Sequence, residues 1–514
     1  MKPNNVVVVL LDSLNRHMLG CYGGDEFETP HLDRFAARSV QFENHYVGSL
    51  PCIPARHDLL CGSWDFLWRP WGSIELWEES ITASLRRQGV TTMLCSDHPH
   101  LFETGGENYH TDFSAWNYSR GHENDPWKTR PDPSATGTPA LPAGKGHGHR
   151  YDVNRTWFRK EEDYPGPHTM IQAADWLQTS AACHDRFLLL VDEFDPHEPF
   201  DTPAPWANRY DPDWQGELII WPPYAADAVA TGKLTHREAR HIRANYGAKL
   251  SMIDHWFGHL MSTLDELDLW QNTAVILCTD HGHYLGEKDL FGKPGVPHYQ
   301  PLAHIPLMMY LPGVAAGHRQ ALTTTVDIHA TLADIFEAGI NHVTHGHSLL
   351  PLLQGEANEI RSTVLAGVFG RWVHLIAHQP SSVNGDSGVI LKYARGPVTG
   401  SNLPLSLWSN RWSTMPVATY PNLTLPRPDS QAFLDHMPGS QIPVIRQPFQ
   451  EGDMLPYWCL GMPESQHHLY NLTLDPQERR NLADSSLEST MQDLLRAELN
   501  AVQAPDDQFE RLGL

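Results

Sequence analysis

The chain has 514 residues, a length that corresponds to roughly three average domains. Hydrophobic residues make up 41% of it, which suffices for a large buried core. This composition excludes a disordered chain and a small module held together by disulfides. The net charge of −24, from 37 basic and 61 acidic residues, argues against nucleic-acid binding, which needs a basic surface.

The N-terminal apolar run, Val6 to Leu11, is too short for the core of a signal peptide and ends at Asp12. No stretch of the sequence reaches the ~18 apolar residues of a membrane span. We therefore expect a cytoplasmic protein that does not associate with a membrane. The seven cysteines are an odd number spread over a long chain, so we expect no disulfide framework.

Four short runs of β-branched and leucine residues are typical of strands buried on both faces, because their hydrophobicity is continuous rather than alternating. They are residues 6–11, 91–95, 187–191 and 274–278. Between them lie helical patterns: Leu250, Phe257 and Leu264 fall on one stripe, and Ser80 is a candidate N-cap for a helix over 81–87. Strands that alternate with helices predict an α/β fold, with a large mixed, mostly parallel sheet sandwiched by helices.

The C-terminal third has a different pattern. Runs at 364–368, 373–377 and 389–394 are shorter than the earlier ones and are not separated by obvious helices. They predict a smaller C-terminal α+β region containing an antiparallel sheet, so we divide the chain into a catalytic domain, 1–360, and a subdomain, 361–514. Two segments rich in proline are expected as loops on the body, and these are 121–150 and 401–460.

Each predicted buried strand is followed by acidic or histidine side chains. Ligands of open α/β sheets bind outside the carboxyl ends of the strands, so these side chains are expected at one edge. Carboxylate and imidazole groups gathered there predict a cation site. The residues in question are Asp12, Asp97, His98, His100, Asp192, His197, Asp280 and His281.

A second candidate site surrounds Cys52. Pro54 suits the first turn of a helix, which places Cys52 at the helix N-terminus beside Arg56. Such a position attracts anions and lowers the pKa of a thiol. By these residues alone, a nucleophilic cysteine and an inert core cysteine both remain possible.

Taken together, the motifs resemble a type I sulfatase of the alkaline phosphatase superfamily over nearly the whole chain. In that family the cysteine of the Cys-x-Pro-x-Arg pattern is oxidised after translation to formylglycine. The matching segments here are Cys52-x-Pro54-x-Arg56, Thr279-Asp280-His281-Gly282, His197-Glu198-Pro199, Gly292-Lys293 and Leu469-Tyr470-Asn471-Leu472.

The resemblance implies a role for each of these groups. Asp12, Asp280 and His281 would hold a divalent cation, calcium foremost and Mn²⁺ or Mg²⁺ otherwise. One hydroxyl of the hydrated aldehyde at residue 52 would attack sulfur to give a covalent sulfo-enzyme, and deprotonation of the other would expel sulfate. Arg56 and Lys293 would neutralise the sulfate charge, while His197 would protonate the leaving group.

The chain departs from the family pattern in two places. Ser13 follows Asp12 where many relatives have a second acid or amide, which leaves the metal identity open. A lysine expected over the sulfate is missing near Asp97, so His98 or His100 is expected to bind substrate in its place. The implied partners are a small sulfated ester and a formylglycine-generating enzyme.

Three other interpretations remain open at this stage. A phosphonate monoester hydrolase or phosphodiesterase of the same superfamily shares the core motifs, and one enzyme can hydrolyse both kinds of ester. A metal-dependent binding protein with an unmodified Cys52 is a second alternative. A direct thiolate nucleophile at Cys52 is the third.

Overall fold

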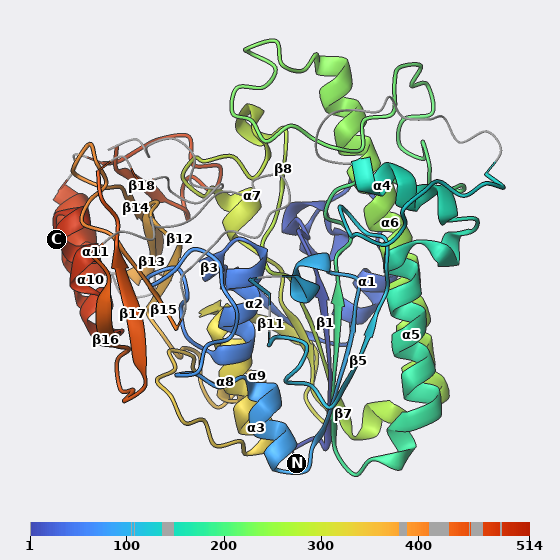
Figure 1. Ribbon diagram of the computed structural model, residues 1–514, viewed down its shortest axis with the longest axis horizontal. Coiled ribbons are helices and arrows are strands. Elements are labelled where there is room, and N and C mark those ends of the chain that lie inside the picture. Colours follow the sequence, from blue (N-terminus) through green and yellow to red (C-terminus); the bar gives the residue numbers. More distant parts are fainter. Residues whose placement is uncertain are drawn as a thin grey trace.

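The computed structural model describes residues 2–103, 105–106, 108–135, 149–379, 388–410, 431–451, 453, 466–483 and 486–514. An eight-stranded sheet runs through its centre (Figure 1). All neighbouring strands in it are parallel except at β10, which is antiparallel to both of its neighbours. The strand order is β11 (Gly317–Thr324), β2 (Val40–Tyr46), β10 (Met308–Tyr310), β7 (Thr273–Cys278), β1 (Asn5–Leu11), β6 (Phe187–Glu193), β4 (Thr91–Ser96) and β5 (Ala115–Tyr118).

The four strands expected from continuous apolar runs are the four adjacent strands β7, β1, β6 and β4. Their carboxyl ends are level with one another, because Leu10 pairs with both Asp192 and Cys278, and Ser96 pairs with Asp192. The sheet therefore brings the polar residues that follow these strands to one edge, as expected for a mixed, mostly parallel sheet.

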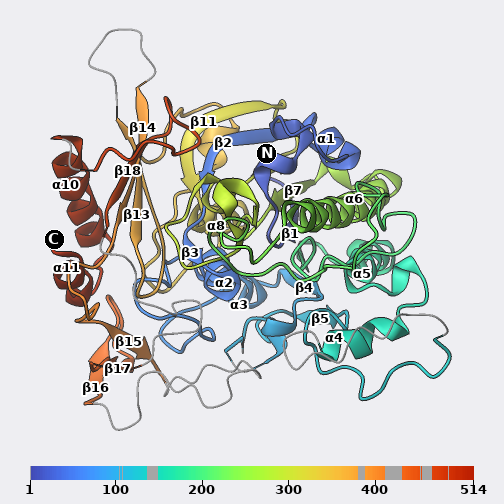
Figure 2. The same cartoon turned by 90° about the horizontal axis from the view of Figure 1, so that it is seen from above.

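Helices cover both faces of the sheet, and the residues of β1 alternate between two cores. Val7 and Val9 pack on one side with α1 (Pro30–Ala36), α5 (Pro165–Ser180) and α6 (His236–Glu266). Val6 and Val8 pack on the other, where Figure 2 shows α2 (Cys52–Cys61), α3 (Ile81–Arg87) and α8 (Thr325–Phe336); α9 (Leu350–Leu353) belongs to the same core. The expected N-cap is confirmed, because the Ser80 hydroxyl accepts a hydrogen bond from the backbone N–H of Ala83.

A second sheet of five strands lies beside the first, and the three predicted strands of the C-terminal region are confirmed in it. The order is β18 (His468–Asn471), β14 (Val389–Arg395), β13 (Val373–Gln379), β12 (Thr363–Val368) and β3 (Ser49–Leu50). The pairs are antiparallel except that of β12 with β3. The helices α10 (Ser486–Ala501) and α11 (Asp506–Leu512) cover this sheet (Figure 1).

The segment 401–460 is more regular than expected, and the prediction of a loop there is wrong in its described part. It contains a three-stranded antiparallel sheet formed by β15 (Ser406–Ser409), β17 (Pro443–Pro448) and β16 (Phe433–His436). These strands are short and rich in polar residues, so they lack the apolar run that marks a strand in the sequence. Residues 411–430, 452 and 454–460 of this segment lie outside the described residues. In the other expected loop, 121–150, residues 136–148 also lie outside them, and α4 (His149–Asn154) begins at its end.

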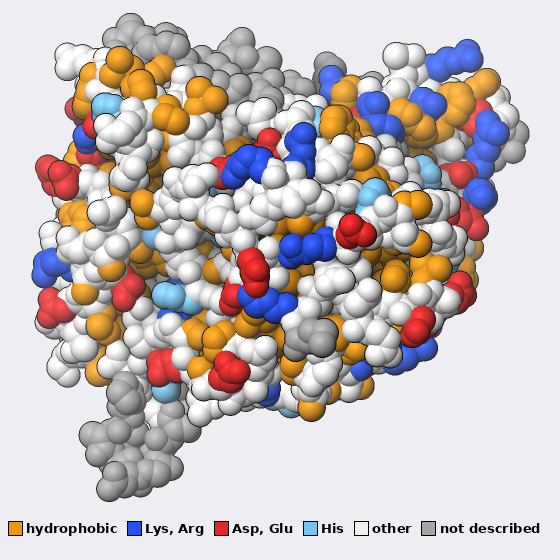
Figure 3. Space-filling model, turned by 90° about the horizontal axis from the view of Figure 1, so that it is seen from below, with side chains coloured by type: hydrophobic (Ala, Val, Ile, Leu, Met, Phe, Trp, Pro, Cys, Tyr) orange, Lys and Arg blue, Asp and Glu red, His pale blue; other side chains and the backbone are white. Residues whose placement is uncertain are grey.

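None of the helices in the described part of the chain has the length and apolarity needed to cross a bilayer. Figure 3 shows Lys and Arg side chains interspersed with Asp and Glu over one face of the molecule.

Candidate active site

Cys52 stands at the first residue of α2, directly after β3 and Pro51. The helix is buried along its whole length and ends at Gly62, whose φ of 73° suits glycine. The Cys52 Sγ atom lies 3.4 Å from His281 Nε2 and 3.7 Å from Lys293 Nζ. Three residues from distant parts of the sequence thus meet around one sulfur atom.

Arg56 lies one turn further along α2 and connects three carboxylates. Its Nη1 atom is 3.0 Å from Asp12 Oδ2 and 2.9 Å from Asp280 Oδ2, and it also donates to the carbonyl oxygen of Cys52. Its Nε and Nη2 atoms donate to the two oxygens of Asp192 at 2.8 and 2.6 Å. All these groups are buried, so one guanidinium faces three carboxylates and negative charge is left uncompensated.

The sequence places Asp192 after a predicted strand, among the groups of the predicted cation site, but assigns it no role beside Arg56. Its position at the end of β6 was the available signal. What the sequence does not contain is the bidentate pairing with Arg56, which arises between residues 136 positions apart.

The buried groups fit a divalent cation. The donor atoms of Asp12, Cys52, Asp280 and His281 all lie within 4.8 Å of one another. Asp12 Oδ2 and His98 Nε2 are 3.6 Å apart, and within the described part of the chain neither atom takes part in a well-aligned hydrogen bond. Hard carboxylate oxygens with imidazole nitrogens are suitable ligands for Ca²⁺, Mg²⁺ or Mn²⁺.

The pKa of Asp12 supports this fit. Burial, followed by the negative charge of Asp280, raises the pKa of the Asp12 carboxyl well above its ordinary value. The His281 ring is oriented by its Nδ1 atom, which lies 2.9 Å from the carbonyl oxygen of Gly282. Since a carbonyl only accepts, Nδ1 carries the proton and Nε2 is left as a donor atom for a metal.

The environment of Cys52 differs from the sequence expectation of an acidic thiol. Burial, and then the charge of Asp12, raises the pKa of the Cys52 thiol well above its ordinary value. These effects outweigh Arg56 and the helix N-terminus. The structure therefore disfavours a free thiolate nucleophile at this position.

Lys293 follows the two-stranded hairpin of β8 (Tyr284–Leu285) and β9 (Phe291–Gly292) and reaches toward His197. Its Nζ atom lies 2.9 Å from His197 Nε2. The other ring nitrogen, Nδ1, lies 2.7 Å from the carbonyl oxygen of Glu198 and therefore carries the proton. Burial lowers the pKa of His197 to about 3, and the charge of Lys293 adds to this effect, so the free imidazole is neutral at pH 7.

The loop that carries His197 is fixed by side chains from other elements. Lys249, on α6, donates to the carbonyl oxygen of Pro199 at 2.7 Å and lies 2.5 Å from Asp195 Oδ1. His122 Nε2 lies 2.8 Å from Asp195 Oδ1 as well. The sequence offered no local signal for Lys249 or His122, because neither lies in a motif nor follows a predicted strand.

The two histidines expected near the sulfate occupy different surroundings. His98 is fully buried beside Asp12, within the group of metal donors. The ring nitrogens of His100 lie instead 2.5 Å from Glu103 and 3.1 Å from Glu123. Burial alone would lower the pKa of His100, but these two carboxylates raise it to about 10.

The mixed, mostly parallel sheet covered by helices is the fold also seen in solved structures of a phosphonate monoester hydrolase and a putative sulfatase. The model of the family described as Sulfatase matches residues 4–338, so the chain belongs to the sulfatase family. It is accordingly a sulfuric ester hydrolase.

Similar proteins span a range of esters. The chain is 27% identical to a choline-sulfatase of Rhizobium meliloti, with 69% of this chain and 72% of that protein covered. It is 26% identical to human iduronate 2-sulfatase over 62% of this chain, and it covers 61% of that protein's length. In fold it resembles the phosphonate monoester hydrolase of Agrobacterium radiobacter, with a TM-score of 0.61, 18% identity, and 98% and 96% of the two chains covered.

Proposed function

We propose that the chain hydrolyses sulfate monoesters, with Cys52 converted to formylglycine as the nucleophile and a divalent cation, calcium foremost, in the site. The observation that carries the proposal is the meeting of Cys52 with His281 at 3.4 Å and Lys293 at 3.7 Å. The names of the choline- and iduronate-sulfatase relatives support a sulfate ester as the substrate. The covalent sulfo-enzyme route expected from the family resemblance is part of this proposal.

Asp12, Asp280 and His281 would hold the cation, and His98 adjoins them. When bound, the cation would act as a Lewis acid on the sulfate oxygens and on the nucleophile. Arg56 orients the residues of this group, since it touches Asp12, Asp280 and the backbone of residue 52. Lys293 adds a positive charge that favours an anionic ester.

His197 is suited to protonating the leaving group. Its Nδ1 proton is held by the carbonyl oxygen of Glu198, so Nε2 is the atom that exchanges a proton. Lys293 Nζ lies against this Nε2 atom at 2.9 Å. The neutral imidazole has no proton on Nε2, so the Lys293 ammonium supplies it; we assign its transfer through Nε2 to the leaving-group oxygen, which leaves Lys293 neutral.

The other expectations remain part of the proposal. They are a formylglycine-generating enzyme as the partner that oxidises Cys52, a cytoplasmic location, and the division into 1–360 and 361–514. Substrate binding by His98 fits its place beside Asp12. Substrate binding by His100 stays a prediction, and both of its ring nitrogens already lie against carboxylates.

The test begins with mass spectrometry of the peptide that carries residue 52, in protein produced together with a formylglycine-generating enzyme. The same protein is then assayed against matched aryl sulfate, phosphodiester and phosphonate monoester substrates. We expect an aldehyde at residue 52 and the highest kcat/KM with the sulfate. An unmodified cysteine in fully active protein would refute the formylglycine, and a preference for phosphonate or phosphodiester would replace the sulfate in the proposal.

A further inference from the structure

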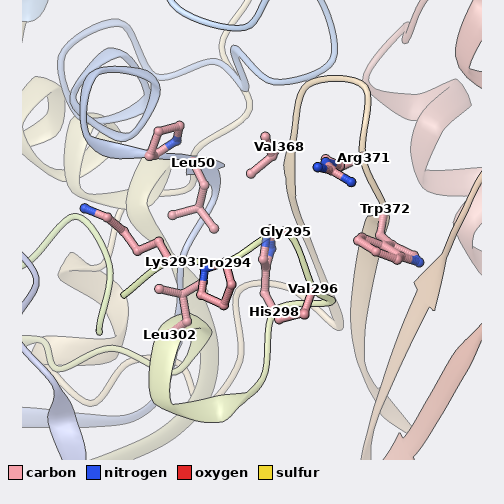
Figure 4. Close-up of a pocket in the computed structure, with 11 residues that line it drawn as sticks. Leu50, Lys293, Pro294, Gly295, Val296, His298, Leu302, Val368, Arg371 and Trp372 are labelled. Atoms are coloured by element: carbon pink, nitrogen blue, oxygen red, sulfur yellow. The ribbon is translucent and has the colours of Figure 1, made fainter. Parts of the chain in front are cut away.

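A pocket of about 40 Å³ lies between Lys293 and the turn that joins β12 to β13 (Figure 4). Figure 4 shows Lys293 at one end of this pocket and Arg371 with Trp372 at the other. The register explains why the turn lies beside the nucleophile. Val368 at the end of β12 pairs in parallel with Leu50 at the end of β3, so the turn after Val368 and the segment Pro51–Cys52 after Leu50 leave the sheet at the same edge.

The pocket begins on the side of the site where the leaving group must depart. Lys293, which lines it, has its Nζ atom 3.7 Å from Cys52 Sγ and 2.9 Å from His197 Nε2. His197 is the group proposed to protonate the leaving-group oxygen. An ester held between Cys52 and His197 therefore has its alcohol portion next to the opening of the pocket.

The chemistry of the walls favours negative charge. Two cationic side chains, Lys293 and Arg371, line the pocket, and no Asp or Glu is found among its lining residues in the described part of the chain. Among the described residues, the Nδ1 atom of His298, which lines the pocket and is 6% exposed, has no hydrogen-bond partner. Burial lowers the pKa of His298 to about 3, so it is a neutral hydrogen-bonding group.

The size of the pocket limits what enters it. A volume of about 40 Å³ holds roughly three water molecules, which matches one small polar substituent rather than a sugar or aromatic ring. Gly295 leaves room for the cation at the far end, because a Cβ atom there would lie 2.8 Å from Arg371 Nη2.

We propose that this pocket receives an anionic substituent of the leaving group, a carboxylate or a second sulfate, which pairs with Arg371 and hydrogen bonds to His298. The substrate class is then a sulfate ester whose alcohol portion carries a second negative charge. This inference rests on the proposed sulfate ester hydrolysis. It assigns a specificity-determining residue to the C-terminal sheet, which the matched family region 4–338 does not include.

The test compares esters that differ only in this substituent. The probes are 3- and 4-carboxyphenyl sulfate, the corresponding bis-sulfates, and the neutral carboxamides, assayed with wild type, Arg371→Met and Arg371→Lys. We expect wild type to prefer at least one of the anionic series over its carboxamide by about tenfold or more in kcat/KM, and this ratio to fall toward one in Arg371→Met. Comparison of the carboxyphenyl sulfates with the bis-sulfates shows which anion the pocket binds better. Arg395→Met, which removes another buried arginine of the same sheet, is the matched control and is expected to keep the wild-type ratio.

Wild type with equal kcat/KM for charged and neutral probes would overturn the inference, and so would an Arg371→Met protein with the wild-type ratio. The same comparison is made for Kd by calorimetry on Cys52→Ala protein, which does not require turnover. A preference in Kd that depends on Arg371 supports the pocket even where no sulfate is hydrolysed, whereas failure of the proposed function appears as absent turnover of every sulfate by aldehyde-bearing wild type.

Discussion

At the scale of single residues, the site is organised by charge that its own side chains do not balance. Asp12, Asp192 and Asp280 surround the one guanidinium of Arg56 in a fully buried position. Such an arrangement is costly for the protein alone and becomes favourable with a cation. Burial, and then the charges of Asp12 and Asp280, raise the pKa of the Cys52 thiol, which disfavours a thiolate and agrees with the proposed modification.

Replacing Cys52 with alanine removes the proposed nucleophile with little change in volume. We expect turnover of aryl sulfates to fall by roughly 10³-fold or more, because no neighbouring group can take its place. Steady-state kinetics of purified protein measure the loss, and circular dichroism verifies the fold. A Cys52→Ala protein that retains activity would eliminate the mechanism.

Removing the metal is expected to abolish activity. Chelation leaves Asp12 and Asp280 facing each other without a cation, so the sulfate loses its Lewis acid. Activity should return on addition of Ca²⁺, Mn²⁺ or Mg²⁺, and the ion that restores it best identifies the native metal. Full activity in protein shown by elemental analysis to be free of metal would contradict the site.

At the scale of elements, strand ends deliver the proposed metal ligands, while helices and loops hold the proposed reacting groups in place. α2 carries Cys52 and Arg56 one turn apart, so both point into the same site. The loop after β6 carries His197 and is tied to α6 through Lys249. Lys249 is therefore a positioning residue, since it acts on His197 through the loop.

The variant Lys249→Met is expected to loosen this loop and misplace His197. A displaced proton donor slows poor leaving groups more than good ones, so the dependence of kcat/KM on the pKa of the leaving phenol should steepen. A series of substituted phenyl sulfates measures this slope.

Stability must be separated from positioning in that experiment, because Lys249→Met also leaves Asp195 buried without its cation. The double variant Lys249→Met/Asp195→Asn removes that charge and should recover stability while the steep slope persists. Lys233→Met, an exposed lysine before α6, is the matched control. An unchanged slope in stable double-variant protein would argue against positioning.

At the scale of the whole molecule, acidic composition and a site for anions coexist because the positive charge is local. Arg56 and Arg371 are buried and Lys293 is half-buried around the site, whereas the chain as a whole carries a net charge of −24. Histidine is also distributed unevenly between surface and core, and several of the 31 histidines are buried in neutral form.

Buried neutral histidines predict acid sensitivity. Burial lowers the pKa of His45 and of His329 to about 3, whereas in the unfolded chain each titrates near 6.5. Between these pH values the unfolded state binds the extra protons, so stability is full above pH ~6.5 and is lost as pH falls toward 3. Calorimetric melting temperatures should therefore decline steadily below pH ~6.5.

His329→Leu provides the check on this assignment, because it removes one such titration at a site where neither ring nitrogen hydrogen bonds to any described residue. The pH dependence of unfolding should weaken by up to about 1.4 kcal/mol per pH unit. A variant with the wild-type slope would show that His329 does not contribute.

The amino-acid sequence by itself determined the central strands and the antiparallel C-terminal strands, and it indicated the candidate site residues that the fold brings together. Continuous apolar runs and local motifs contain that information, since each depends on neighbouring residues. The sequence does not predict the short strands β15, β16 and β17, because their stability comes from pairing rather than from a local pattern.

Only the tertiary structure decided how these residues interact. Four features join residues far apart in the chain. They are the high pKa of the Cys52 thiol, the pairing of Arg56 with Asp192, the contact of Lys249 with the His197 loop, and the place of Arg371 at the far end of the pocket that begins at Lys293. Burial and Coulomb energies depend on distance in space, which a linear sequence does not specify. For this reason the sequence indicated the candidate groups for the chemistry, whereas the fold set their charge and the pocket beside them.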